Sequence, residues 1–326
     1  MNKRKEYFSK KITNRTIDTL LKINSLINST SQKKCMVYGN CQARPLARLL
    51  SVDKNFSKKY QIINYKPVYT IEGKDLYHLE KICKKIDLFI YQPIKTGYLD
   101  LYEIGTDFLK SLLTKDSISI SFHSLYFDAY NPECIYIKRT DSEGVHQGPF
   151  GDYHNEILIQ LYIDKLNYRD TVQYLRASKA KDPSSIEKNL DQSINELFRR
   201  EQTKNIDIKI AQYIKDNYQQ KRLFWTFNHP SNDILIHCSQ EIIKRLGMNY
   251  SANFCKKKIT SYELLDMTCF SIHPSIYETL NLSFNNPDVY YYKGQTFELN
   301  EVVKIFYIYY DNHPEVIEAY QENIFR

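Results

Sequence analysis

Short apolar runs that alternate with helical patterns are the feature that most constrains the fold of this chain. Apolar runs occur at residues 35–39, 60–65, 86–92 and 117–123. Between them, apolar residues recur every three or four positions, as they do on one face of a helix. Strands joined by helices form a parallel sheet that is covered on both faces. The sequence therefore predicts a three-layer α/β fold with a mostly parallel sheet.

The second half of the chain adds helices to this core. Residues from about 150 to 218 have helical patterns, and Ile186, Leu190, Ile194 and Leu197 mark one apolar face. We expect a large helical insertion, with a two-helix hairpin or a dimerisation arm as the alternative. A homo-oligomer is compatible with this pattern.

A later apolar run at 222–227 predicts another strand. The helical pattern that follows it ends at Gly247, which is typical of a helix C-terminus. A further helix is expected within 299–313. We interpret residues 35–326 as a single α/β domain with a helical insertion and C-terminal helices.

The net charge of +7 belongs to an N-terminal arm at residues 1–34. The arm has nine Lys/Arg and two Asp/Glu, which leaves 36 residues of each sign in the rest of the chain. The body is therefore neutral and does not have the basic surface typical of nucleic-acid binding. The arm has no apolar run long enough for a signal peptide or a membrane span. It is either a frayed helix that leads into the domain or a reversible contact with anionic lipid or a partner.

Composition and cysteine usage indicate an ordinary globular protein of a reducing compartment. Hydrophobic residues make up 42% and charged residues 25% of the chain, so composition gives no sign of disorder. The seven cysteines are odd in number and form neither a CxxC pair nor a Cys/His spacing typical of metal sites. We expect cytoplasmic localisation, mostly buried thiols and no metal.

Polar clusters follow four of the predicted strands. In an open parallel sheet, ligands bind outside the carboxyl ends of the strands. The clusters there are Gly39-Asn40-Cys41-Gln42, Gln92, His123 and Asn228-His229. A fifth cluster, Asp152-Tyr153-His154, is expected at the start of a helix, where backbone N–H groups favour an anion.

Cys41 is the leading candidate for chemistry. The N-terminus of the helix expected after it carries partial positive charge, which favours the nucleophilic thiolate. A neighbouring imidazole such as His229 could take the proton. The alternatives are a small buried thiol and a structural histidine. Arg44 and Arg48 lie one helical turn apart and suit a phosphate or a carboxylate, unless they are simply exposed.

Several of these segments resemble a known family. The segments YGNCQARPLARLL, YQPIKTGY, GPFGDYHNEILIQLY and TFNHPSNDIL occur in the same order as in the WcbI-type polysaccharide biosynthesis proteins. The resemblance covers roughly residues 35 to 310, and the GNCQ and NHP segments are its most specific parts. Members of this family are regarded as acetyltransferases of capsular sugars, with coenzyme A as ligand.

The strand-to-helix corner also resembles the first block of the SGNH-type hydrolases, which have a flavodoxin-like three-layer fold. Their Gly-Asp-Ser would align with Gly39-Asn40-Cys41, so the resemblance implies a nucleophilic Cys41 and makes His229 the candidate base. Thr226 stands three residues before that histidine, where the hydrolases have an orienting Asp. A dyad, or orientation of His229 by Asn228, Asp152 or a backbone carbonyl, is left open.

The resemblance implies an acetyl-coenzyme A-dependent O-acetyltransferase that modifies a sugar hydroxyl of a capsular or other surface polysaccharide. Either His229 takes the proton of the sugar hydroxyl as it attacks the thioester directly and Cys41 only lines the site, or the Cys41 thiolate takes the acyl group first and passes it on. The Asn40 and Gln92 amides, with the backbone N–H of Cys41 or Gln42, would stabilise the oxyanion. Arg44, Arg48 and Lys95 would contact the coenzyme phosphates. The alternatives are an esterase that uses the same residues and a non-catalytic carbohydrate- or nucleotide-binding subunit. If the enzyme contacts the inner face of the membrane, we expect residues 1–34 to make that contact.

Overall fold

The computed structural model describes residues 32–139, 144–177, 182–251, 263–286 and 288–324. Nearly all of the expected N-terminal arm therefore lies outside the described residues. The chain divides into two compact units. Among the described residues, unit 1 comprises 32–124, 199–212, 232–251 and 263–264, and unit 2 comprises 125–139, 144–177, 182–198, 213–231, 265–286 and 288–324. The chain thus passes from one unit to the other several times.

Unit 1 contains the predicted parallel sheet. Its strands are β1 (Lys33–Tyr38), β2 (Tyr60–Ile63), β3 (Leu88–Tyr91) and β4 (Ile118–Ser121), and their order in the sheet is β2-β1-β3-β4. All three pairings are parallel. β1 and β3 consist largely of buried apolar residues, as expected for strands covered on both faces.

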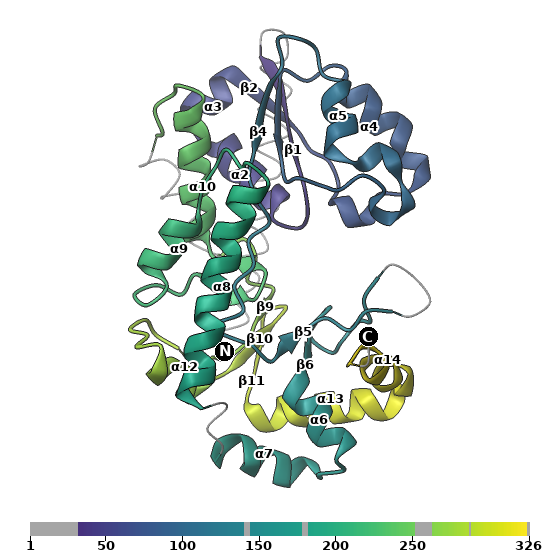
Figure 1. Cartoon of the computed structure of the whole chain (residues 1–326), viewed down its shortest axis with the longest axis vertical. Coiled ribbons are helices and arrows are strands. Elements are labelled where there is room, and N and C mark those ends of the chain that lie inside the picture. Colours follow the sequence, from purple (N-terminus) through teal and green to yellow (C-terminus); the bar gives the residue numbers. More distant parts are fainter. Residues whose placement is uncertain (1–31, 140–143, 178–181, 252–262, 287, 325–326) are drawn as a thin grey trace. The chain divides into compact units, whose positions relative to one another are not determined.

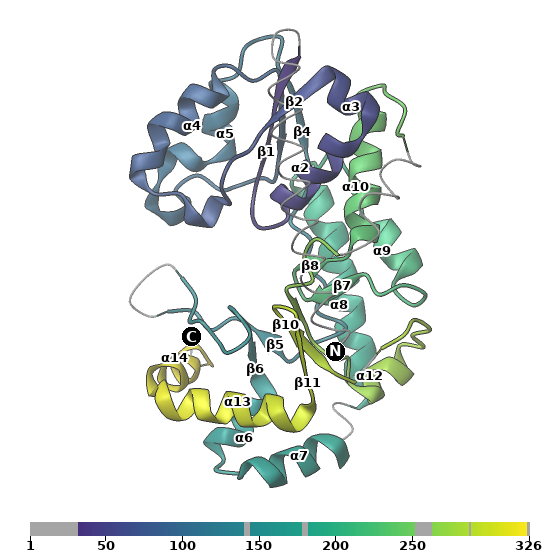
Figure 2. The ribbon, with the colours of Figure 1, turned by 180° about the vertical axis from the view of Figure 1, so that it is seen from behind.

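Helices cover both faces of this sheet, which confirms the three-layer α/β fold (Figures 1 and 2). One face carries α4 (Leu76–Cys83) and α5 (Thr106–Ser111). The other carries α2 (Ala43–Val52) and α10 (Asn232–Arg245). The short helix α3 (Lys54–Lys59) follows α2 and leads directly into β2.

The side of the sheet next to α4 and α5 holds a dense apolar core. It includes Met36 and Phe89 from the strands, Leu79 from α4 and Leu109 from α5. The connections after β2 and β3 contain four short 3-10 helices, η1 (Val68–Thr70), η2 (Gly73–Asp75), η3 (Tyr98–Asp100) and η4 (Tyr102–Ile104). The predicted end of α10 is confirmed, because Gly247 has a φ of +67° and follows the last helical turn.

Unit 2 is built from short antiparallel strands. The pairs are β5 (Cys134–Ile135) with β6 (His154–Asn155), and β7 (Phe224–Thr226) with β8 (His229–Pro230). A three-stranded sheet has the order β11-β10-β9, from β9 (Thr268–Cys269), β10 (Tyr290–Tyr292) and β11 (Gln295–Phe297).

Helices and aromatic side chains complete unit 2. Its helices are α6 (Glu156–Ile163), α7 (Tyr168–Ala177), α12 (Pro274–Thr279), α13 (Leu299–Asn312) and α14 (Pro314–Ile324). Phe150 lies at the centre of the core, and its ring contacts those of Phe270, Tyr292, Phe297 and Phe306. The predicted helix within 299–313 is confirmed as α13, and its Phe306 and Tyr310 are buried.

The expected helical stretch from 150 to 218 contains α6, α7, α8 (Pro183–Thr203) and α9 (Ala211–Asn217). α8 begins in unit 2 and ends in unit 1, since the units divide between Phe198 and Arg199. Function of residues 35–326 as one catalytic domain stays a prediction.

The predicted strand at 222–227 exists, but its expected place in the parallel sheet is wrong. β7 pairs antiparallel with β8, two residues further along the chain, and both belong to unit 2. A run of apolar residues indicates that a strand is buried, but it does not indicate whether the strand belongs to a parallel sheet or to a short antiparallel hairpin. The tight reversal at Phe227-Asn228 decides the pairing.

Candidate functional site

The predicted corner between β1 and α2 lies at the carboxyl end of a central strand of unit 1. We call residues Gly39–Gln42 the corner. Gly39 and Gln42 are buried, and Asn40 and Cys41 are half-buried. The turn closes on itself, because the Gln42 N–H donates to Asn40 Oδ1 at 3.0 Å and the Ala43 N–H donates to the Asn40 carbonyl at 3.1 Å. Cys41 is therefore held two residues before α2.

Gln92, at the carboxyl end of β3, fixes the corner from the neighbouring strand. Its Oε1 accepts the Asn40 N–H at 2.7 Å, and its Nε2 donates to Gln42 Oε1 at 3.1 Å. Both glutamine side chains are 1% exposed. A Cβ on Gly39 would lie 2.3 Å from Gln92 Oε1, so only glycine permits this approach.

These contacts correct part of the expected oxyanion site. The Gln42 N–H already donates to Asn40 Oδ1, and the Gln92 side-chain amide already donates to Gln42 Oε1. Gln92 and Gln42 bind each other between neighbouring loops, so they hold the shape of the corner. The sequence missed this role because it depends on the register between β1 and β3, in which Tyr38 pairs with Tyr91.

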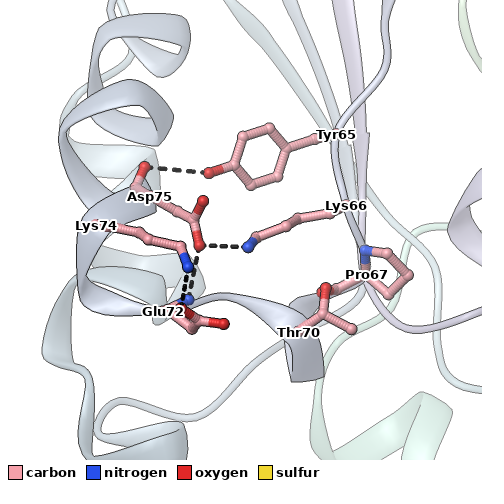
Figure 3. A network of polar contacts seen from close by, with 7 residues as sticks. All are labelled: Tyr65, Lys66, Pro67, Thr70, Glu72, Lys74 and Asp75. Atoms are coloured by element: carbon pink, nitrogen blue, oxygen red, sulfur yellow. Dashed lines mark hydrogen bonds and ion pairs between the residues drawn. The ribbon is translucent and has the colours of Figure 1, made fainter.

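The loop after β2 packs against the corner. The Val68 N–H donates to the Gly39 carbonyl at 2.9 Å. Figure 3 shows the polar contacts that fix this loop: Asp75 pairs with Lys66 and accepts the Glu72 N–H at 2.8 Å. The hydrogen bond with Lys66 is the largest cause that lowers the pKa of Asp75. The sequence pattern does not predict this network.

His123 follows the end of β4, as predicted, and is 3% exposed. Its Nδ1 is 2.7 Å from the Ser124 carbonyl oxygen, and its Nε2 is 3.8 Å from Glu201 Oε1. Asn40 Nδ2 lies 3.5 Å from Ser124 Oγ. The contact between Asn40 and Ser124 joins the ends of β1 and β4. Cys41 follows Asn40 in sequence and His123 precedes Ser124, so each is one residue away from this contact.

The candidate cationic residues lie on the surface of unit 1. Arg44 and Lys95 are exposed, and Arg48 is half-buried. α2 has no acidic residue in its first turn and no side-chain cap at Gln42. This helix start can therefore accept a negative group without removing an existing capping carboxylate.

The other predicted residues lie in unit 2. Asn228 is 3% exposed and occupies the turn between β7 and β8. Its Oδ1 accepts the Tyr153 hydroxyl at 2.6 Å, and its Nδ2 donates to the Tyr136 hydroxyl at 2.7 Å. Thr226 Oγ1 lies 3.0 Å from the Tyr153 hydroxyl oxygen. Thr226, at the position of the hydrolase Asp, thus belongs to a buried polar network.

His229 begins β8, and its ring contacts the edge of Tyr153 with centroids 5.6 Å apart. Burial lowers the pKa of His229 to about 4, against a smaller opposing effect of a hydrogen bond with the Leu265 backbone. The ring is therefore neutral near pH 7. What orients His229 stays a prediction.

The expected anion site at Asp152-Tyr153-His154 is not formed as predicted. α6 begins only at Glu156, and Asn155 caps it by accepting the Leu158 N–H at 3.0 Å. His154 is fully buried, with Nε2 3.3 Å from the His146 carbonyl oxygen. Asp152 accepts a hydrogen bond from Gln147. The cluster therefore precedes the helix and does not expose its N–H groups.

Unit 2 also has a separate cavity of about 590 Å³. Arg176, His273 and Tyr290 are among its lining residues, and none of the site residues predicted from the sequence lines it. The part of the chain that the structure describes contains no cluster of three metal-ligating residues. Among the same residues, no helix has the length and apolar character needed to span a bilayer.

His154 gives a prediction for the pH dependence of stability. Burial lowers its pKa to about 4, whereas an unfolded histidine titrates near 6.5. The unfolded state therefore takes up a proton first as pH falls through this window, and the free energy of unfolding decreases. We expect His154→Gln to reduce the loss between neutral pH and about pH 4.5 by on the order of 2–3 kcal/mol. Chemical denaturation at both pH values measures the free energy of unfolding of the wild type and of the variant.

The matched control is His78→Gln, since His78 is exposed in unit 1. That variant measures the effect of the same substitution at an exposed position. An unchanged dependence in His154→Gln would show that His154 does not titrate differently in the folded and unfolded states.

Comparison with known proteins supports the resemblance seen in the sequence. The family described as polysaccharide biosynthesis enzyme WcbI matches residues 34–251, more than half of the chain. No curated protein matches the chain in sequence. One solved structure is described as WcbI, a novel polysaccharide biosynthesis enzyme, as native protein without a disulfide bond between coenzyme A and one of its cysteines. It shares 22% identity, covers 88% of this chain and 98% of its own, and has a TM-score of 0.72, which shows the same fold.

Proposed function

This chain belongs to the WcbI family of polysaccharide biosynthesis enzymes, and we propose that it is an acyl-coenzyme A-dependent O-acetyltransferase. The proposed acceptor is a sugar hydroxyl in a capsular or other surface polysaccharide, or in its precursor. The observation that carries the proposal is the position of Cys41. It follows β1 at the point where the strand order β2-β1-β3 reverses direction, which is where open α/β sheets bind ligands.

The corner fits an acyl donor with an anionic coenzyme. Cys41 is half-buried two residues before α2, and the first turn of that helix has no acidic residue. Arg44, Arg48 and Lys95 are the proposed contacts for coenzyme phosphates. The related solved structure is described with reference to a disulfide between coenzyme A and a cysteine, which supports a thiol beside the coenzyme here.

We propose that Cys41 carries the acyl group between donor and acceptor. The Cys41 thiolate attacks the thioester carbonyl, the bond from that carbon to the coenzyme sulfur breaks, and the departing coenzyme thiolate takes up a proton. The sugar hydroxyl oxygen then attacks the acyl carbon, and Cys41 leaves as thiolate. His229, neutral near pH 7, is the proposed acceptor of the hydroxyl proton.

Incubation of the full chain with acetyl-coenzyme A tests the proposal. Intact-mass measurement should detect one added acetyl group, and peptide mapping should locate it on Cys41. Coenzyme thiol release should then rise when mono- and disaccharide acceptors are added. Equal release with water alone would indicate an esterase. Absence of coenzyme binding and of acetylation would overturn the proposed function.

A further inference from the structure

We propose that Glu201 is a positioning residue that holds His123 as a doubly protonated imidazolium at the carboxyl edge of the unit 1 sheet. The positive charge would stabilise negative charge at the corner during acyl transfer. The role of this charge in acyl transfer rests on the proposed function, whereas the positioning of His123 by Glu201 does not. Glu201 was not among the residues predicted from the sequence.

The end of α8 brings Glu201 to the sheet. After this helix the chain runs beside β4, where Ile208 forms a parallel bridge with Phe122 and its N–H donates to the Ser121 carbonyl at 3.0 Å. Asp207 accepts the Ser121 N–H at 2.8 Å and pairs with Arg245 of α10 at 2.9 Å. Residues 206–208 thus extend the sheet edge immediately before His123.

The Glu201 carboxylate has a fixed orientation. Its Oε1 accepts the N–H groups of Ile210 and Ala211 at 2.5 and 2.8 Å, where the chain enters α9. The side chain is 4% exposed. Two N–H donors to one oxygen hold the carboxylate in one place. The same Oε1 faces His123 Nε2 at 3.8 Å.

Both nitrogens of His123 therefore face oxygens that only accept hydrogen bonds. Nδ1 must carry a proton, because its partner at 2.7 Å is the Ser124 carbonyl. A proton on Nε2 turns its 3.8 Å contact with the Glu201 carboxylate into an ion pair. The arrangement selects the ring with both nitrogens protonated.

The charge of His123 lies close to the corner in the same unit. Ser124 follows His123, and its Oγ is 3.5 Å from Asn40 Nδ2. Asn40 in turn precedes Cys41.

Glu201→Gln tests the positioning. A glutamine keeps the size of the side chain, and its carbonyl oxygen can still accept the Ile210 and Ala211 N–H groups, but it carries no negative charge beside His123 Nε2, so the ring should become neutral. Nitrogen NMR of histidine-labelled full chain, with the His123→Asn variant for assignment, reports the protonation of each ring nitrogen near neutral pH. Two protonated nitrogens in the wild type and one in Glu201→Gln are expected. Glu187→Gln, an exposed change on the same helix, should match the wild type.

The kinetic readout uses the same variants. With acetyl-coenzyme A and a sugar acceptor, Glu201→Gln should lower kcat about 10-fold or more, with KM changed only about 2-fold. One protonated ring nitrogen in the wild type, or identical spectra in wild type and Glu201→Gln, would overturn the inference even if acyl transfer is observed. The NMR result stands by itself if the chain transfers no acyl group. A kcat unchanged in Glu201→Gln would refute the contribution to transfer.

Discussion

Cys41→Ala is expected to abolish acetyl transfer while leaving the protein folded. The side chain is half-buried at the end of a loop, and the hydrogen bonds that hold the corner come from Asn40, Gln42 and Gln92. Removal of the sulfur therefore costs little packing but eliminates the proposed nucleophile. Loss of a nucleophile that forms a covalent intermediate lowers kcat by on the order of 10³-fold or more.

The measurement compares coenzyme thiol release and sugar acetylation in wild type, Cys41→Ala and Cys269→Ala. Cys269 is also half-buried but lies in unit 2, where burial raises the pKa of its thiol. Its replacement should leave the transfer rate unchanged. Intact mass should show an acetyl group on the wild type and on Cys269→Ala, and none on Cys41→Ala.

Two results would contradict this prediction. If Cys41→Ala transfers acetyl at the wild-type rate, the sugar hydroxyl attacks the thioester directly and Cys41 only lines the site. The second result combines two experiments. Both cysteine variants would restore polysaccharide acetylation in cells that lack the wild-type chain, and the isolated wild-type protein would transfer no acetyl group. The chain would then act as a binding subunit.

The sequence was sufficient to predict the layers of unit 1 and the strand ends at which the candidate site lies. Strands β1 and β3 are short, apolar and flanked by helical patterns. The apolar runs and the helical spacing between them therefore predict the same parallel sheet. Gly39, Gln92 and His123 were placed at the strand ends by this reasoning alone. Their contacts with one another depend on strand register, which local patterns do not specify.

Glu201 shows why the rest of the site could not be predicted directly. It lies four residues after Leu197 and so continues the apolar face marked by Ile186 and Ile194. A carboxylate at a position that the helical period assigns to the core is a signal of a buried polar partner. The identity of that partner follows only from the return of the chain along β4, a contact across 78 residues of sequence.

The division into two units was also not visible in the sequence. Linkers rich in Gly, Pro or Ser often mark domain boundaries, but here the chain crosses between units within α8 and within α9. The antiparallel pairing of β7 likewise depends on contacts of Asn228 with Tyr136 and Tyr153, which are distant in sequence. Local patterns identify such segments as structured without assigning them to a unit.

Gly39→Ala is expected to have the largest effect on the stability of unit 1. The new Cβ would lie 2.3 Å from Gln92 Oε1 and 2.8 Å from its Cδ, closer than real Cβ contacts. Gln92 must then move, which breaks its hydrogen bonds to Asn40 and Gln42. Overpacking and the unpaired buried amides together should cost about 2–5 kcal/mol. Gly73→Ala is the matched control, since nothing lies within 4 Å of its added Cβ.

A double-mutant cycle identifies the cause. Gln92→Ala alone should destabilise unit 1 by about 1–3 kcal/mol, because it leaves the Gln42 side chain and the Asn40 N–H without their partner. In the double mutant, Gly39→Ala should add little further loss in the free energy of unfolding, because the side chain with which the new Cβ clashes is absent. The difference between the cost of Gly39→Ala with and without Gln92 is the coupling energy of the two residues. Hydrogen exchange of β1 and β3, followed by mass spectrometry, is the suitable readout, because Trp225, the single tryptophan, lies in unit 2. If the two costs simply add, Gln92 does not impose the requirement for glycine at this corner.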